Sequence, residues 1–316
     1  MAGHIIHNQS YSDIYQKLPM KMQEEFESSW DSYNIFAQGH DLFFPYMFLH
    51  FYKLPTLIKQ LKVIQDEGIQ KLTINYINGL QEVGATHEAK LFLYGYLLHH
   101  FLDAKLHPLV IYETGNFIND KQAEALHLKV ENMIDAYQLK KQGIDPRTFK
   151  IHSTVKSNMA LTSRTKQLVD ASFLKTYGYV NLGKVFEKYN ANTKKYLYLL
   201  RYDPQGLKTL LFTPFDYVMS NIFKPGVFPF HYDGTEAIDY LNLENKPWIH
   251  PIDSDSISTK SFDELYTEGV EAIAKMISML NEAIIDQATN EQISGIIPNI
   301  SSHTGVLPKQ LIKNFK

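Results

Sequence analysis

The chain has 316 residues, no cysteine and a formal net charge of −3. The lack of cysteine excludes disulfides, thiolate zinc sites and a cysteine nucleophile. The slightly acidic balance disfavours a nucleic-acid partner, because general nucleic-acid binders usually carry a basic excess. A hydrophobic content of 44% is that of a globular protein with a sizeable core.

The N-terminal segment predicts a protein without a leader. Residues 1–7 lack the basic region and the apolar run of a secretory signal. The most apolar stretch, residues 42–51, is interrupted by Pro45 and is shorter than the ~18 residues that a membrane helix needs. We therefore expect a cytoplasmic protein with no transmembrane segment, and the sequence predicts no particular oligomeric state.

Helical periodicity recurs along the chain and alternating strand patterns are scarce, which predicts an all-α protein forming a single domain over residues 1–316. The expected helices cover residues 56–79, 86–106, 119–136, 155–176, 181–200, 205–222 and 262–286. Thr86 is expected to cap the second helix, and Asn119 or Asp120 the third. Residues 224–260, rich in proline, glycine and aromatics, are typical of a lid or binding loop, and the tail at 290–316 is also expected to be loop-like.

Four of the 13 histidines lie between residues 99 and 127. His99, Asp103 and His107 are four residues apart, and a four-residue step on a helix turns only about 40°, so these side chains lie along one stripe. The helix around them is apolar, and burying a carboxylate between imidazoles is costly unless a group such as a divalent cation compensates it. Pro108 disfavours helical geometry at His107, so the helix is expected to end there.

The next expected helix repeats this spacing with His127 and Glu131. Two helices that each present histidine and carboxylate are typical of a site for several metal ions, and such ligands suit Zn²⁺, Mn²⁺ or Fe. The simpler interpretation of one such pair is a solvated helix face. His100 points away from the stripe and is expected to be structural.

Two residues nearer the N-terminus are candidates for the same site. His7 comes just before a helical segment, and Asp41 stands at the start of an apolar run. Each alone is also explained as a terminal histidine or as a turn aspartate.

Taken in order, the chain contains an early histidine, Gly-x-Asp before Phe-rich residues, the pattern GYxxHxxxDxxxHP, and then HxxxE. The residues that carry these motifs are His7, Gly39, Asp41, Gly95, Tyr96, His99, Asp103, His107, Pro108, His127 and Glu131. The series resembles the bacterial zinc-dependent phospholipase C family, which is related to the S1/P1-type nucleases. The motifs cover roughly residues 1–136, and a looser likeness extends through residues 246–251 and 261–266.

The resemblance implies an all-α phospholipase C/P1 nuclease-like fold around two or three zinc ions. The implied ligands are His99, Asp103 and Asp41 for the first ion, His107, His127 and Glu131 for the second, and His7 for a third. Asp103 would bridge two ions. At the third ion, the N-terminal amine of processed members has no evident counterpart here, and His4 could replace it.

Two positions depart from the family pattern. Gln65 stands about where the family usually places a histidine ligand, and an amide oxygen is a poorer zinc ligand than imidazole. Gln65 is therefore a ligand replacement, for which His50 or Asp66 could compensate. His40 replaces the proline that is common after the glycine of the Gly-x-Asp motif.

The activity that the resemblance implies is phosphoester hydrolysis by a phospholipase C-like phosphodiesterase that uses a metal-activated water. Asp41 is expected to act as a ligand or as a general base. Four aromatic residues could line a substrate pocket, although core packing explains each one singly as well: Tyr217, Phe230, Tyr232 and Trp248. The substrate would be a phospholipid or a small-molecule phosphoester. The alternatives are a nuclease or phosphomonoesterase with a small soluble substrate, and a non-catalytic helical protein that metal stabilises.

Overall fold

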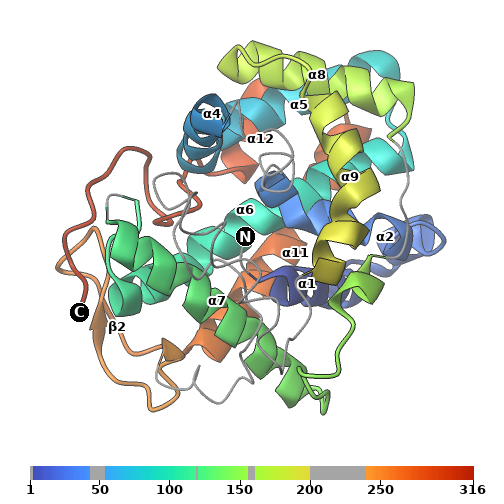
Figure 1. The fold of residues 1–316 in the computed structure, drawn as a ribbon. Helices are drawn as coiled ribbons and strands as arrows, with labels where there is room; N and C mark the ends of the chain where they lie inside the picture. The colour runs from blue at the N-terminus through green and yellow to red at the C-terminus, as the bar shows by residue number, and fades with distance from the viewer. Residues whose placement is uncertain (1–2, 43–53, 119, 156–160, 200–239) are drawn as a thin grey trace.

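The computed structural model describes residues 3–42, 54–118, 120–155, 161–199 and 240–316, which form a mostly helical structure (Figure 1). The elements in chain order are α1 (His4–Lys17), α2 (Met20–Phe26), the 3-10 segment η1 (Asp31–Leu42), α4 (Leu54–Asp66), α5 (Ile69–Val83), α6 (His87–Thr114), α7 (Lys121–Lys141), η3 (Ile151–Thr154), α8 (Ser163–Tyr177), α9 (Leu182–Leu199), β1 (Trp248–Ile249), β2 (Ile257–Ser258), α11 (Phe262–Ile285) and α12 (Asn290–Ile296). No described helix is long and apolar enough to cross a membrane.

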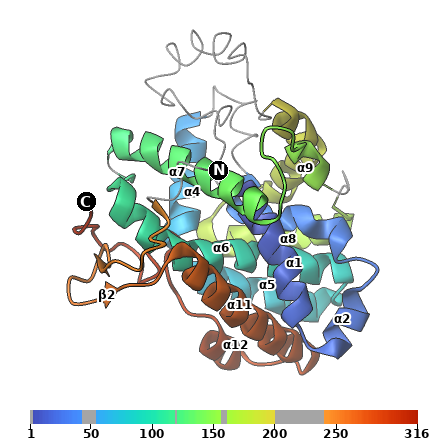
Figure 2. The same ribbon diagram turned by 90° about the horizontal axis from the view of Figure 1, so that it is seen from below.

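Helix α6 is the central element and is buried along nearly all of its length. It contacts α1, η1, α7 and α11, and Figure 2 shows α7 and α11 on different sides of it. Burial on all sides follows from its sequence, which is apolar around the whole helix. Thr86 caps its N-terminus as expected, because the Thr86 side chain accepts a hydrogen bond from the amide of Ala89.

The prediction that this helix ends at His107 is wrong, because α6 continues through Pro108 to Thr114. Proline has no N–H, so the Ala104 carbonyl loses its helical donor. The backbone of Gly305 lies against this carbonyl, and a Cβ on Gly305 would be 2.3 Å from the Ala104 oxygen. A later segment of the chain therefore covers the point where the proline interrupts the helical hydrogen bonds.

Other expectations for the helices are also wrong. Residues 56–79 belong to two helices, α4 and α5, which separate at Gly68 with φ of 84°. Helix α8 begins at Ser163 rather than near residue 155. The tail contains α12, whose N-terminus is formed by a capping box between Thr289 and Gln292.

The remaining described helices agree with the sequence, except that α7 continues to Lys141 and does not end near residue 136. Asp120 caps α7 by accepting from the amides of Gln122 and Ala123, whereas Asn119 lies outside the described residues. Helices α9 and α11 lie within one residue of the expected boundaries. The helix expected at 205–222 lies outside the described residues. The described part of the expected 224–260 loop, from residue 240 onward, contains the small antiparallel β1–β2 hairpin.

Candidate metal centre

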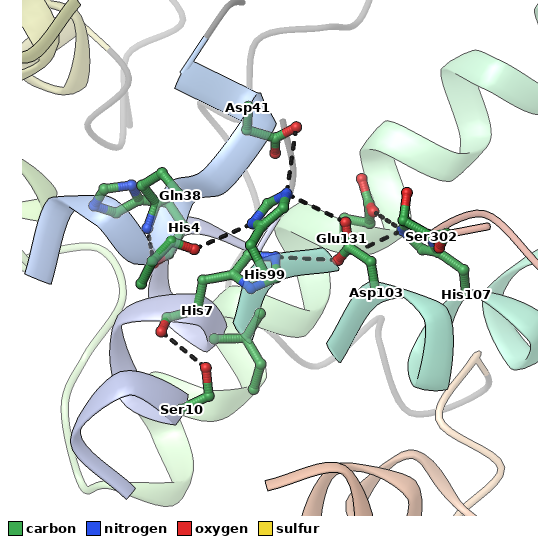
Figure 3. Close-up of polar contacts among 12 residues, drawn as sticks. His4, His7, Ser10, Gln38, Asp41, His99, Asp103, His107, Glu131 and Ser302 are labelled. Atoms are coloured by element: carbon green, nitrogen blue, oxygen red, sulfur yellow. Dashed lines mark hydrogen bonds and ion pairs between the residues drawn. The ribbon is translucent and has the colours of Figure 1, made fainter. Parts of the chain in front are cut away.

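Histidine and carboxylate side chains from four elements meet beside α6, and Figure 3 shows most of them. We call this set the His/carboxylate cluster. Its members are His7 from α1, His40 and Asp41 from η1, His99, Asp103 and His107 from α6, and His127 and Glu131 from α7. The structure thus brings together every metal-ligand candidate that the sequence motifs indicated, and adds His40.

Asp103 lies at the middle of the cluster. Its Oδ1 is 3.1 Å from Nε2 of His7 and 3.9 Å from Nε2 of His107. Its Oδ2 is 3.3 Å from Nε2 of His99 and 3.8 Å from Nε2 of His40. Each carboxylate oxygen of Asp103 therefore faces a different pair of imidazoles.

Glu131 joins the α7 residues to α6. Its Oε1 lies 2.9 Å from Nε2 of His127 and 3.2 Å from Nε2 of His107. His107 consequently lies between the carboxylates of Asp103 and Glu131. Two neighbouring carboxylates with a shared imidazole form a continuous row of metal-binding groups.

Three sets of side chains within the cluster could each hold a metal ion, because their ligand atoms lie within 4.8 Å of one another. The sets are His7, His99 and Asp103, then His40, Asp41 and His99, and finally His107, His127 and Glu131. The first two sets share His99.

Backbone carbonyls fix the orientation of two of these rings. Nδ1 of His99 lies 3.1 Å from the carbonyl oxygen of Ala37, and Nδ1 of His107 lies 2.8 Å from that of Ser302. A ring that donates from Nδ1 to a carbonyl presents Nε2 as the lone-pair donor, the arrangement typical of metal-bound histidine. The carbonyls thus favour the tautomer in which both Nε2 atoms can bind a cation.

The charges of the cluster suit a cation. Burial lowers the pKa of His40, His99 and His127, which favours the neutral imidazole that binds metal. Burial disfavours the ionised form of Asp103 and Glu131, but the neighbouring histidines outweigh it and hold the pKa of both carboxyls below the usual range.

His107 and Asp41 differ from their neighbours. Burial opposes the charged form of His107, yet the carboxylates of Asp103 and Glu131 outweigh it and raise the pKa of His107 to about 9. Burial raises the pKa of Asp41 to about 6. Asp41 Oδ1 lies 3.8 Å from Nε2 of His99.

The donor set fits a divalent cation on two observations. Among the described residues, the ionisable partners of Asp103 and Glu131 are histidines, and Nε2 of His99 and Oε2 of Glu131 are buried without a hydrogen-bond partner. Tetrahedral zinc with bonds of about 2.0–2.1 Å separates its ligand atoms by about 3.3 Å. The separations of 2.9–3.9 Å in the cluster bracket that value.

Several expected residues have other roles. His4 is within hydrogen-bond distance of the Thr154 hydroxyl at 2.7 Å, outside the cluster, and His100 bonds the carbonyl of Ile300 as a structural histidine. Gln65 contributes its backbone carbonyl, which accepts from the amide and the hydroxyl of Ser302. Gln65 therefore supports the Ser302 segment that orients His107.

The remaining candidates lie elsewhere in the chain. His50 lies outside the described residues, and the carboxylate of Asp66 accepts from the Lys309 amide. Trp248 is buried in the core, its indole N–H donates to the Lys260 carbonyl, and no described contact joins it to the cluster. The other aromatic residues proposed for a substrate pocket lie outside the described residues: Tyr217, Phe230 and Tyr232.

Three residues near the cluster were missed from the sequence. The sequence motifs indicate His40 only as a replacement for a proline. Asp135 continues the four-residue spacing after Glu131, so extending that pattern would have found it; it accepts from the amides of Ile5 and Ile6 at 3.0 Å each. His303 is buried 6.2 Å from the His107 ring, and no local pattern predicts it.

Comparisons with known proteins add no family assignment. No protein-family model, curated protein or solved structure matches the chain. A function for the chain must therefore be inferred from the geometry and chemistry of the site.

Proposed function

We propose that this chain is a metal-dependent phosphoester hydrolase, a phosphodiesterase similar to phospholipase C. The observation that carries the proposal is the row of buried donors in which Asp103 faces imidazoles on both sides and His107 connects it to Glu131. Such a row would allow two cations to bind next to each other, and paired cations are a common solution for in-line displacement at phosphorus. The motif resemblance to the phospholipase C family supports the same assignment.

The proposed ligands divide between the helices. His107, His127 and Glu131 would hold one ion, and Asp41, His99 and Asp103 another, with His7 beside Asp103 for a third. Zinc is the proposed metal, with Mn²⁺ and Fe as alternatives for the same N and O donors. When bound, such ions neutralise phosphate charge and lower the pKa of water toward about 7.

The protein's own groups supply orientation and proton transfer. The carbonyls of Ala37 and Ser302 hold the His99 and His107 rings in their binding orientation. If Asp41 is not a ligand, its carboxylate, whose pKa burial raises to about 6, would instead take a proton from the attacking water near neutral pH. The water oxygen would form a bond to phosphorus while the bond to the leaving oxygen breaks, and the proton lost by the water would pass to that oxygen, which yields a phosphomonoester and an alcohol.

The proposed substrate is a phospholipid or a small-molecule phosphoester. The net charge of −3 disfavours the polyanionic backbone of a nucleic acid. A phosphomonoester or a small nucleotide diester would use the same donors, so a substrate panel separates these variants of one activity.

A non-catalytic, metal-stabilised protein is the second candidate. The observation that favours it is the deep burial of the donors, since His99 is 0% and His7 2% exposed. A structural zinc site is closed by four protein ligands, whereas a catalytic site keeps a position open. Metal count and turnover together distinguish the two candidates.

The first test is the metal content of the protein purified without chelators. We expect at least two equivalents of metal by elemental analysis and hydrolysis of a chromogenic phosphodiester or a phospholipid. Asp103→Ala should lose both metal and activity, because Asp103 faces four imidazoles. Asp255→Ala, an exposed aspartate on the hairpin, is the matched control and should retain both.

Two outcomes would contradict the proposal. A protein that carries no metal and gains no thermal stability from zinc, manganese or iron would overturn the hydrolase assignment. A protein that is fully loaded with metal but hydrolyses neither phosphodiesters, phosphomonoesters nor phospholipids would support the structural candidate instead.

A further inference from the structure

One histidine of the cluster lacks a hydrogen-bond partner among the described protein groups. His40 is 0% exposed, and neither of its ring nitrogens has a hydrogen-bond partner in the described part of the chain. An imidazole that leaves water without gaining a hydrogen bond is destabilising. The ring therefore needs a partner that the neighbouring side chains do not supply.

The backbone of η1 brings this ring to the cluster. Gly39 has φ of 47°, a conformation that favours glycine, and a Cβ on it would lie 2.6 Å from the Cβ of His99. The chain can therefore cross α6 closely at this point only without a side chain. His40 follows directly, and its ring meets that of His99 edge-on, with centroids 4.3 Å apart.

The donor atoms around His40 converge. Ligand atoms of His40, Asp41 and His99 lie within 4.8 Å of one another. Oδ2 of Asp103 lies 3.8 Å from Nε2 of His40 and 3.3 Å from Nε2 of His99. These separations are longer than most hydrogen bonds and close to the roughly 3.3 Å between ligands of a tetrahedral zinc ion.

His99 can bind only one metal ion, and this determines how the cluster divides into metal sites. Nδ1 of His99 is bonded to the Ala37 carbonyl, so only Nε2 remains, and one lone pair binds one ion. The set containing His7 and the set containing His40 therefore cannot each hold their own ion through His99. The two oxygens of Asp103 indicate the division, since Oδ2 faces His40 and His99 while Oδ1 faces His7 and His107.

We propose that His40 is a metal ligand and that it completes a four-ligand site with Asp41, His99 and Oδ2 of Asp103. This assignment rests on the proposed function and deepens it. Two imidazoles and two carboxylates complete the four-coordinate shell of zinc. No ligand is then needed from α4, the helix that carries Gln65. The site made by His107, His127 and Glu131 has three protein ligands, so it is the one that keeps a position open for substrate.

The test is a metal titration of chelator-treated protein with Zn²⁺ and Co²⁺, followed by calorimetry and by the visible absorption of bound Co²⁺. We expect His40→Phe, which keeps a ring but no donor, to lose one equivalent or to bind it at least 100-fold more weakly. His40→Asn should do the same, and it keeps the test valid if the phenylalanine variant does not fold. His127→Phe should lose a different equivalent.

His100→Gln is the matched control, because His100 is also 0% exposed and its ring lies 6.2 Å from that of His40. This variant should keep the full stoichiometry. Normal stoichiometry and affinity in both His40 variants, with loss in His127→Phe, would overturn the role of His40 and leave the proposed function standing. Absence of metal binding in the wild type would overturn both.

Discussion

At the scale of single residues, the cluster combines imidazoles whose pKa values are shifted in opposite directions. Burial lowers the pKa of His40, His99 and His127, whereas the pKa of His107 is raised to about 9 against the effect of burial by Asp103 and Glu131. Of these four imidazoles, His107 is thus the one at which a proton competes most strongly with a metal ion. Metal binding at this residue should release protons.

The pH dependence of stability in chelator-treated protein tests this difference. The pKa of His107 in the folded protein lies above the ordinary value of 6.5. Its contribution to the free energy of unfolding is therefore complete below pH 6.5. This contribution is lost as pH rises toward 9, by up to about 1.4 kcal/mol per pH unit. His99 and His127 have lowered folded pKa values, so their contributions are lost as pH falls below 6.5. We expect thermal stability to be greatest near pH 6.5.

His107→Gln should remove the decline above pH 6.5 and leave the decline at lower pH. Saturating zinc should move the maximum to higher pH, because protons then compete with the ion for the ring. A stability profile of the stripped wild type that still rises between pH 7 and 9 would contradict this assignment of charge.

At the scale of elements, α7 positions α1 in addition to carrying candidate metal ligands. The carboxylate of Asp135, one helical turn beyond Glu131, accepts from the amides of Ile5 and Ile6 at the start of α1. Those amides belong to the first turn of a helix, which has no intrahelical acceptors for them. His7 lies on the same turn, so Asp135 fixes the end of α1 that carries this ligand candidate.

We expect Asp135→Ala to lower the free energy of unfolding by about 1–3 kcal/mol, because two buried amides lose their acceptor. Metal binding on the His7 side of Asp103 should weaken in the same variant, while the site of His127 and Glu131 keeps its affinity. Denaturant unfolding and zinc titration measure the two effects. Equal weakening of every metal site would show instead that Asp135 supports the fold as a whole.

At the scale of the whole molecule, a segment near residue 302 completes the surroundings of α6. Ser302 accepts from His107 and donates to the Gln65 carbonyl, and Gly305 lies against Ala104. This segment links α4 and α6 although it is remote from both in sequence.

Gly305→Ala tests this packing. Gly305 has φ of 67° and its Cβ would meet the Ala104 oxygen at 2.3 Å, so we expect a loss of roughly 1–3 kcal/mol in unfolding free energy and weaker metal binding at His107. Gly295→Ala is the control: it lies in α12, its Cβ would meet nothing within 4 Å, and alanine favours a helix. Comparable destabilisation of the two variants would contradict the argument.

The local part of this arrangement could be predicted from the sequence. The stripe of His99, Asp103 and His107 depends only on helical spacing, and so does the pair His127 and Glu131. What the spacing could not predict depends on contacts between distant segments. Helix α6 continues through Pro108 where Gly305 packs closely against the Ala104 carbonyl, and the place of His40 depends on the close approach of η1 to α6.

The link between His7 and Ser302 through the cluster also has a consequence for biosynthesis. Ser302, which orients His107, is translated almost three hundred residues after His7. The complete coordination environment therefore cannot exist on a nascent chain that is still inside the ribosome at residue 302. Under the proposed function, we therefore expect an ion to bind with full affinity only after residue 302 has been synthesised.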